Sequence, residues 1–154
     1  MRDAILMGLV GGQRAMTPLA MVSVAAARGE LSADNSALPI LSRPIVAAGA
    51  LALAVLEMAG DKQKTAPDRI VAIGLTARFI TNAVAGAALS TRRDRWLGAA
   101  VGGLTAVVAS YPGWRARMAA IPVYGQSATG FVEDAAVVAS AAAIVRGQQQ
   151  GAQA

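Results

Sequence analysis

Apolar stretches close to the thickness of a bilayer make up most of this chain of 154 residues. A membrane-spanning helix needs about 20 consecutive apolar residues, because the hydrocarbon core is about 30 Å thick and a helix rises about 1.5 Å per residue. Five segments approach or reach that length: 3–27, 38–57, 70–89, 96–110 and 131–145. They predict an all-α fold, a polytopic transmembrane helical bundle with four or five spans.

The balance of residue types supports a membrane location. Hydrophobic residues make up 55% of the chain and charged residues only 15%, whereas soluble domains are about 25% charged. Ala, Gly, Val, Leu and Ile carry the excess, and small side chains allow close helix contact in lipid. The competing interpretation is an Ala-rich soluble bundle, which the lengths of the apolar segments disfavour.

The first segment, 3–27, is interrupted near its midpoint. The apolar residues 4–10 are followed by Gly11-Gly12-Gln13-Arg14, and a second apolar run starts near Pro18. Gly weakens a helix and Pro suits the first turn of a new one. We therefore expect two half-helices, a broken or re-entrant segment. A signal peptide is the alternative, but Arg14 would split its apolar region and no secreted-type domain follows.

The later segments predict a simple arrangement within one domain. The polar turn 90–95 is short, so segments 70–89 and 96–110 should lie antiparallel to each other. Residues 1–146 are predicted to form a single transmembrane helical domain. Residues 147–154 are rich in Gln, Gly and Ala and are predicted to be a disordered polar tail.

Polar and charged residues inside apolar segments are the candidates for function. A charge at the bilayer centre costs about 2.5–3.5 kcal/mol on insertion scales, so such groups normally face one another or a water-filled cavity. The predicted intramembrane polar site consists of Arg14, Glu57, Arg78, Asn82, Glu133 and Asp134.

Position within the segments ranks these candidates. Arg78 lies eight residues after Ile70 and eleven before Leu89, too far from either end to reach water easily. It should therefore have an acidic partner. Asp61 and Lys62 follow the apolar run that precedes Glu57, and we interpret both as helix-end charges that meet water.

The adjacent carboxylates Glu133 and Asp134 differ by about 100° around a helix. One of them can face inward while the other caps the start of its helix.

Several kinds of chemistry are disfavoured. The chain has no Cys and no His, so it lacks disulfides, thiolate chemistry, the usual zinc ligands and the commonest general base. No nucleophile–base pair or phosphate-binding loop is present either. We therefore predict no enzyme activity, no cofactor and no metal. The net charge of +5 comes from Lys and Arg that flank the apolar segments, as in membrane proteins, and nucleic acid is not an expected partner.

Short motifs spread over nearly the whole chain resemble a known family. These are Gly12-Gln13-Arg14 with Pro18; Glu57, Asp61 and Lys62; Pro67 and Asp68; Arg78, Phe79 and Gly86; and Glu133 with Asp134. Their order resembles small bacterial integral membrane proteins grouped as domain of unknown function 4126. The resemblance implies a multi-pass protein of the cell membrane, the bacterial inner membrane, and brings with it no established biochemical activity.

Two functions fit these features. The first is a small transporter or channel, a homo-oligomer in the lipid bilayer, in which Arg14 and Arg78 pair with Glu57 and with Glu133 or Asp134 around a path for a small ion or solute. The second is a structural or accessory membrane protein whose buried ion pairs fix helix packing.

Overall fold

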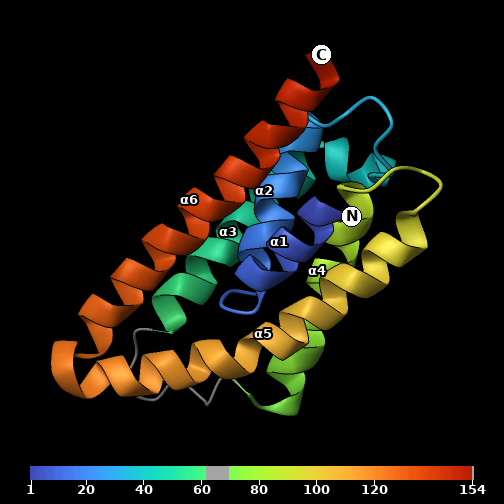
Figure 1. Ribbon diagram of the computed structural model, residues 1–154. Coiled ribbons are helices and arrows are strands. Elements are labelled where there is room, and N and C mark those ends of the chain that lie inside the picture. Colours follow the sequence, from blue (N-terminus) through green and yellow to red (C-terminus); the bar gives the residue numbers. More distant parts are fainter. Residues whose placement is uncertain (62–69, 154) are drawn as a thin grey trace.

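The computed structural model describes residues 1–61 and 70–153, which fold into helices joined by short connections (Figure 1). The helices are α1 (Arg2–Gly11), α2 (Met16–Ala27), α3 (Pro44–Gly60), α4 (Ala72–Ala88), α5 (Arg95–Tyr124) and α6 (Gln126–Gln153), and a 3-10 turn, η1, covers Pro39–Ser42. The described residues contain no strand, only an isolated bridge between Asn35 and Thr91. The predicted all-α fold is confirmed.

The first segment is broken, as predicted. Helix α1 ends at Gly11, and after a short connection α2 runs back beside it, so that the two form a helical hairpin in the middle of the molecule (Figure 1). Glycines place this hairpin directly on α5. A Cβ on Gly8 would lie 2.7 Å from the carbonyl oxygen of Gly102, and one on Gly12 would lie 2.6 Å from the Cβ of Ala109.

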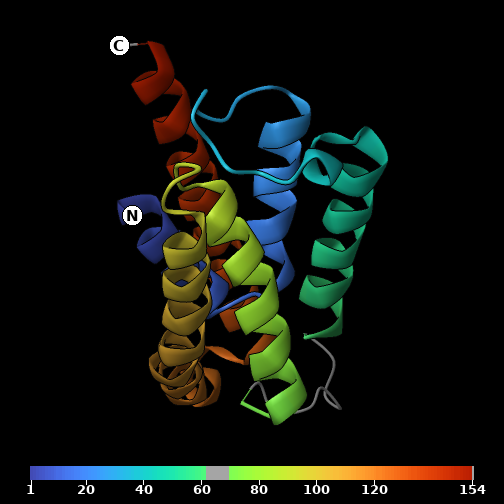
Figure 2. The same cartoon turned by 90° about the vertical axis from the view of Figure 1, so that its right-hand side faces the viewer.

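Helices α4 and α5 form the most extensively packed pair. Gly86 lies against Gly98 near the turn, and Gly103 lies against Phe79 further along, so the two helices run antiparallel as predicted. Figure 2 shows them side by side, with α3 at the opposite edge of the molecule. The glycines allow this close approach, because they offer no side chain to separate the helices.

Helix α5 is twice as long as the predicted segment 96–110. It continues through Pro112 and Pro122 to Tyr124 and stops at Gly125, whose φ of 83° favours glycine. Pro removes one backbone donor but does not end a helix whose other contacts persist. Helix α6 then starts at Gln126, before the predicted Phe131, and the two helices meet in a V (Figure 1).

Helix α6 also extends beyond the predicted end of the helical domain. It continues past Arg146 to Gln153, where the sequence predicts a disordered tail. Ala and Gln favour helix, and the Gln148 amide donates a hydrogen bond to Asp3, at the start of α1.

Helix α3 ends at Gly60, and Asp61 is its C-cap residue. The predicted helix-end charge Lys62 lies outside the described residues.

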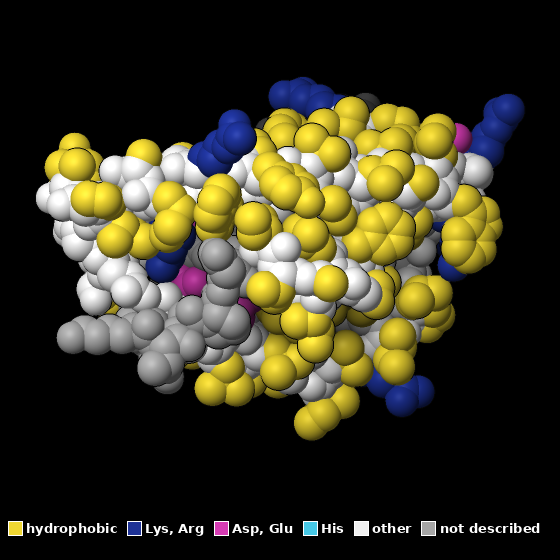
Figure 3. Space-filling model, turned by 90° about the horizontal axis from the view of Figure 1, so that it is seen from below, with side chains coloured by type: hydrophobic (Ala, Val, Ile, Leu, Met, Phe, Trp, Pro, Cys, Tyr) yellow, Lys and Arg dark blue, Asp and Glu magenta, His cyan; other side chains and the backbone are white. Residues whose placement is uncertain are grey.

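The large apolar side chains of this fold lie mostly on its surface. Ile45, Ile73 and Val108 are 78%, 81% and 69% exposed, whereas the buried apolar residues are mostly alanines. Arg14, Asn82 and many hydroxyl side chains are buried instead. Seen from below, apolar side chains cover most of the face, and acidic side chains are visible in a hollow next to a basic one (Figure 3).

By length and composition, one helix within residues 1–61 and 70–153 could cross a membrane. It is the part of α6 from Gln126 to Gln149. Helices α2, α3 and α4 are apolar but shorter.

Candidate functional site

Arg14, at the tip of the α1–α2 hairpin, is the most deeply buried charged side chain described, with 1% of it exposed. Its Nε lies 2.7 Å and its Nη2 2.6 Å from the Oδ1 of Asp134 on α6. Nη2 also lies 3.0 Å from the Oδ2 of Asp61 at the end of α3, and 3.9 Å from Glu133 Oε2. One guanidinium therefore joins the hairpin tip to α3 and α6.

Arg117 on α5 makes a second bridge. Its Nη1 lies 2.8 Å from the Oε2 of Glu133, and its Nη2 lies 2.9 Å from the Oδ2 of Asp61. Nη2 also donates to the backbone carbonyl oxygen of Asp61 at 3.2 Å. The sequence interpretation missed Arg117, because it ended the segment at Ser110 and counted later arginines as flanking charges. The apolar residues that continue beyond Pro112 are the signal that could have found it.

We call Arg14, Asp61, Arg117, Glu133 and Asp134 the ion cluster. The interpretation of Asp61 as a water-facing helix end is corrected. Helix α3 ends against α5 and the hairpin tip, so the Asp61 side chain is only 14% exposed. The idea that Glu133 or Asp134 caps a helix also fails, since α6 starts at Gln126. Both carboxylates instead face the arginines.

Glu57 faces the bundle but binds a helix end instead of an arginine in the contacts described. Its Oε1 and Oε2 accept hydrogen bonds from the backbone N–H groups of Ala15 and Met16, each at 2.8 Å. These are the first N–H groups of α2, which have no partner within their own helix. A carboxylate there also interacts favourably with the positive end of the helix dipole. Glu57 therefore ties α3 to the start of α2.

Arg78 and Asn82 are buried on α4, with 5% and 1% of each residue exposed. The Asn82 amide donates to the carbonyl oxygen of Arg78 at 2.9 Å and lies directly over Gly11 of α1. Arg78 and Asn82 are not among the five residues of the ion cluster. That Arg78 pairs with one of the carboxylates stays a prediction.

The contact between Gly11 and Asn82 leads to a test of the hairpin packing. Gly11→Ala places a Cβ where the Asn82 amide lies, so it should lower the free energy of unfolding by about 1–3 kcal/mol. Gly49→Ala on α3 is the matched control, because nothing lies within 4 Å of that position. Unfolding in detergent micelles measures both variants, and equal stability would contradict the packing described.

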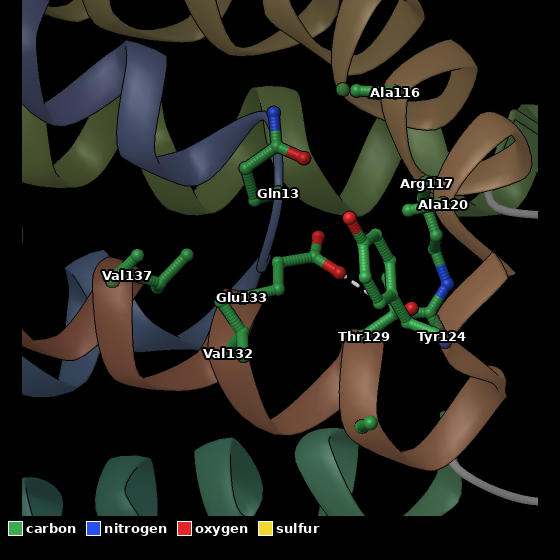
Figure 4. Close-up of a pocket in the computed structure, with 12 residues that line it drawn as sticks. Gln13, Ala116, Arg117, Ala120, Tyr124, Thr129, Val132, Glu133 and Val137 are labelled. Carbon is green, nitrogen blue, oxygen red and sulfur yellow. Dashed lines mark hydrogen bonds and ion pairs between the residues drawn. The ribbon is translucent and has the colours of Figure 1, made fainter.

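A cavity of about 610 Å³ adjoins the ion cluster between the C-terminal half of α5 and the first turns of α6. Its lining residues are Gln13, Gly113, Ala116, Arg117, Ala120, Tyr124, Ala128, Thr129, Val132, Glu133, Ala136 and Val137. Figure 4 shows Glu133, Arg117 and Tyr124 pointing toward one another, and Gln13 entering from the α1–α2 connection.

This arrangement limits the chemistry available at the site. Within residues 1–61 and 70–153, no three Asp or Glu residues are grouped so that they could hold a metal ion. The carboxylates of the ion cluster face arginines. The site thus offers buried charges, an amide and a mostly apolar cavity, which suits binding of a polar group.

The chain was compared with known protein families, curated proteins and solved structures. The model of a family described as "Domain of unknown function (DUF4126)" matches residues 4–146. No curated protein matches the chain, and no solved structure does.

Proposed function

The chain belongs to this family of unknown function, and we propose that it is a multi-pass helical membrane protein of the small-transporter or channel type. The observation that carries the proposal is the reversed distribution of side chains: large aliphatic residues lie on the surface, while arginines and carboxylates lie inside. Water disfavours such an apolar surface. In lipid the same surface is favourable, and the internal charges can pair with one another.

The helix lengths fit this placement. At about 1.5 Å per residue, α1 and α2 span about 15 and 18 Å, roughly half of a hydrocarbon core of about 30 Å. A hairpin of two such helices would enter the bilayer and return, with its tip near the middle. Helices α3, α4, α5 and α6 supply up to four spans, of which α6 satisfies the length and composition criteria.

The hairpin tip supports a transport role. Transporters commonly place their sites where interrupted helices end near the membrane midplane. Here the start of α2, the ion cluster and the cavity meet at one such interruption. Glu133 belongs to both the ion cluster and the cavity wall, so we propose that it carries a proton along a polar path through the bundle.

Proton flux into proteoliposomes tests this role. An entrapped pH-sensitive dye would report flux under an imposed potential, which we expect in the native protein. Glu133→Gln should abolish the flux, because the amide cannot release a proton, while the protein still inserts. The matched control is Glu30→Gln, at a residue whose side chain is 34% exposed near Arg28. Flux that is equal in the two variants would contradict the role.

A structural function is the second candidate, and the bridging geometry favours it. Arg14 and Arg117 join the hairpin tip, α3, α5 and α6 through ion pairs of 2.6–3.0 Å. In that case the cluster fixes helix packing, and native protein and Glu133→Gln would both show no flux. A stability cycle on the same charges, described in the Discussion, measures how strongly they hold the fold.

A further inference from the structure

The cavity beside the ion cluster has a polar end and an apolar rim. Gln13, Arg117 and Glu133 form the polar end, and alanines and valines form most of the remaining wall (Figure 4). At the rim, Tyr124 and Val132 are 71% and 72% exposed. They are part of the apolar surface that the proposed function places in lipid. The cavity therefore opens toward lipid and is polar at its inner end.

The charges on the cavity wall balance each other. Among the described lining residues only Arg117 and Glu133 are charged, and their Nη1 and Oε2 atoms lie 2.8 Å apart. An ion brought into this wall would add an unbalanced charge in surroundings of low polarity, which is unfavourable. An uncharged polar group can instead exchange hydrogen bonds with the Gln13 amide or the Tyr124 hydroxyl.

We propose that this cavity binds an uncharged amphiphile that enters from the lipid phase. Such a molecule has an apolar body and one hydrogen-bonding head, for example a hydroxyl or an amide group. The volume of about 610 Å³ lies within the range of about 300–1,000 Å³ that is usual for small-molecule sites. This inference adds a substrate class to the proposed function and rests on the membrane placement proposed there.

Photolabelling of the full chain in proteoliposomes tests the site. The probe is dodecanol carrying an alkyl diazirine, and the comparison is the matching dodecanoic acid, measured as its carboxylate. We expect the alcohol to label the peptides of residues 116–137 in a saturable way, with competition by excess dodecanol. The carboxylate should label those peptides only weakly.

Filling the cavity provides the matched variants. Ala136→Trp places a large side chain in the cavity wall and should weaken saturable labelling about tenfold or more, whereas Ala135→Trp, exposed on the same helix and outside the lining, should leave it unchanged. Ala128→Trp is a second blocking variant should Ala136→Trp not fold, which gel filtration would show. Equal labelling by alcohol and carboxylate, or equal labelling of blocked and control variants, would overturn the proposal.

The two proposals can fail separately. If the Glu133→Gln variant and the Glu30→Gln control show equal flux while labelling of the cavity stays saturable, the transport role fails and the amphiphile site stands. If Glu133→Gln abolishes flux but labelling is not saturable, the amphiphile site fails and transport stands.

Discussion

Replacing Arg14 with Met should lower the free energy of unfolding by about 3–5 kcal/mol, because it removes a buried cation from the carboxylates that it contacts. Asp134 would lose contacts of 2.6 and 2.7 Å, and Asp61 one of 3.0 Å. Met is similar in length, so the change removes the charge more than the volume. Denaturant unfolding in mixed micelles measures the loss.

A surface arginine and a double variant complete this experiment. Arg28→Met is the control, since that side chain is 68% exposed and its ion pair with Glu30 spans 4.0 Å, and it should change stability by less than about 1 kcal/mol. Adding Asp134→Asn to Arg14→Met should restore part of the loss, giving a coupling energy of about 1–3 kcal/mol. A loss for Arg14→Met no larger than that for Arg28→Met would contradict the ion cluster.

Replacing Glu57 with Ala should have the second largest effect, about 2–4 kcal/mol. The substitution leaves the N–H groups of Ala15 and Met16 without the two acceptors at 2.8 Å, and it removes the charge that favours the start of α2. Unfolding under the same conditions measures the effect. Glu57→Gln keeps one acceptor oxygen and should recover about half of the loss.

Glu30→Ala serves as the reference for Glu57, because Glu30 belongs to a surface loop and is partly exposed. The same loss of stability in Glu30→Ala and Glu57→Ala would show that the contact between α3 and α2 does not hold the hairpin.

Hydrophobic patterning was sufficient to predict the helices and the break in the first segment. Runs of Ala, Val, Leu and Ile marked all of the main elements, and Gly11-Gly12 with Pro18 marked the interruption between α1 and α2. Helix ends were less predictable. The fourth segment was predicted to end at Ser110, but α5 continues through Pro112 to Tyr124, because packing against other helices outweighs one lost hydrogen bond.

The partners of the charged residues could not be read from the sequence. Burial of Arg14, of Arg78 and of one of the two adjacent carboxylates followed from their positions in apolar segments. In the structure Arg14, Arg78 and Asp134 are buried. Asp61 and Arg117 join the ion cluster only because the end of α3 meets α5 at the hairpin tip. That meeting depends on tertiary packing, which joins residues 56 positions apart in the chain.

The partner of Glu57 could not be read from the sequence either. The position of Glu57 after an apolar run made it a candidate for the polar site. Its carboxylate accepts hydrogen bonds from the backbone N–H groups of Ala15 and Met16 at the start of α2. A break in a helix creates N–H groups that need a partner. A carboxylate elsewhere in the chain can be that partner. The local sequence shows neither which carboxylate it is nor how far along the chain it lies.

Cysteine labelling tests the central claim, that the apolar surface faces lipid, most directly. The chain contains no Cys, so each single variant carries one reporter thiol. Val55→Cys, Leu104→Cys and Val108→Cys probe exposed positions on α3 and α5, and Ala33→Cys probes the polar loop after α2. In proteoliposomes permeabilised so that both faces are reached, a charged maleimide should label Ala33→Cys rapidly and the other three hardly at all. Equal labelling of all four positions would show that water covers the apolar surface and would contradict the membrane placement.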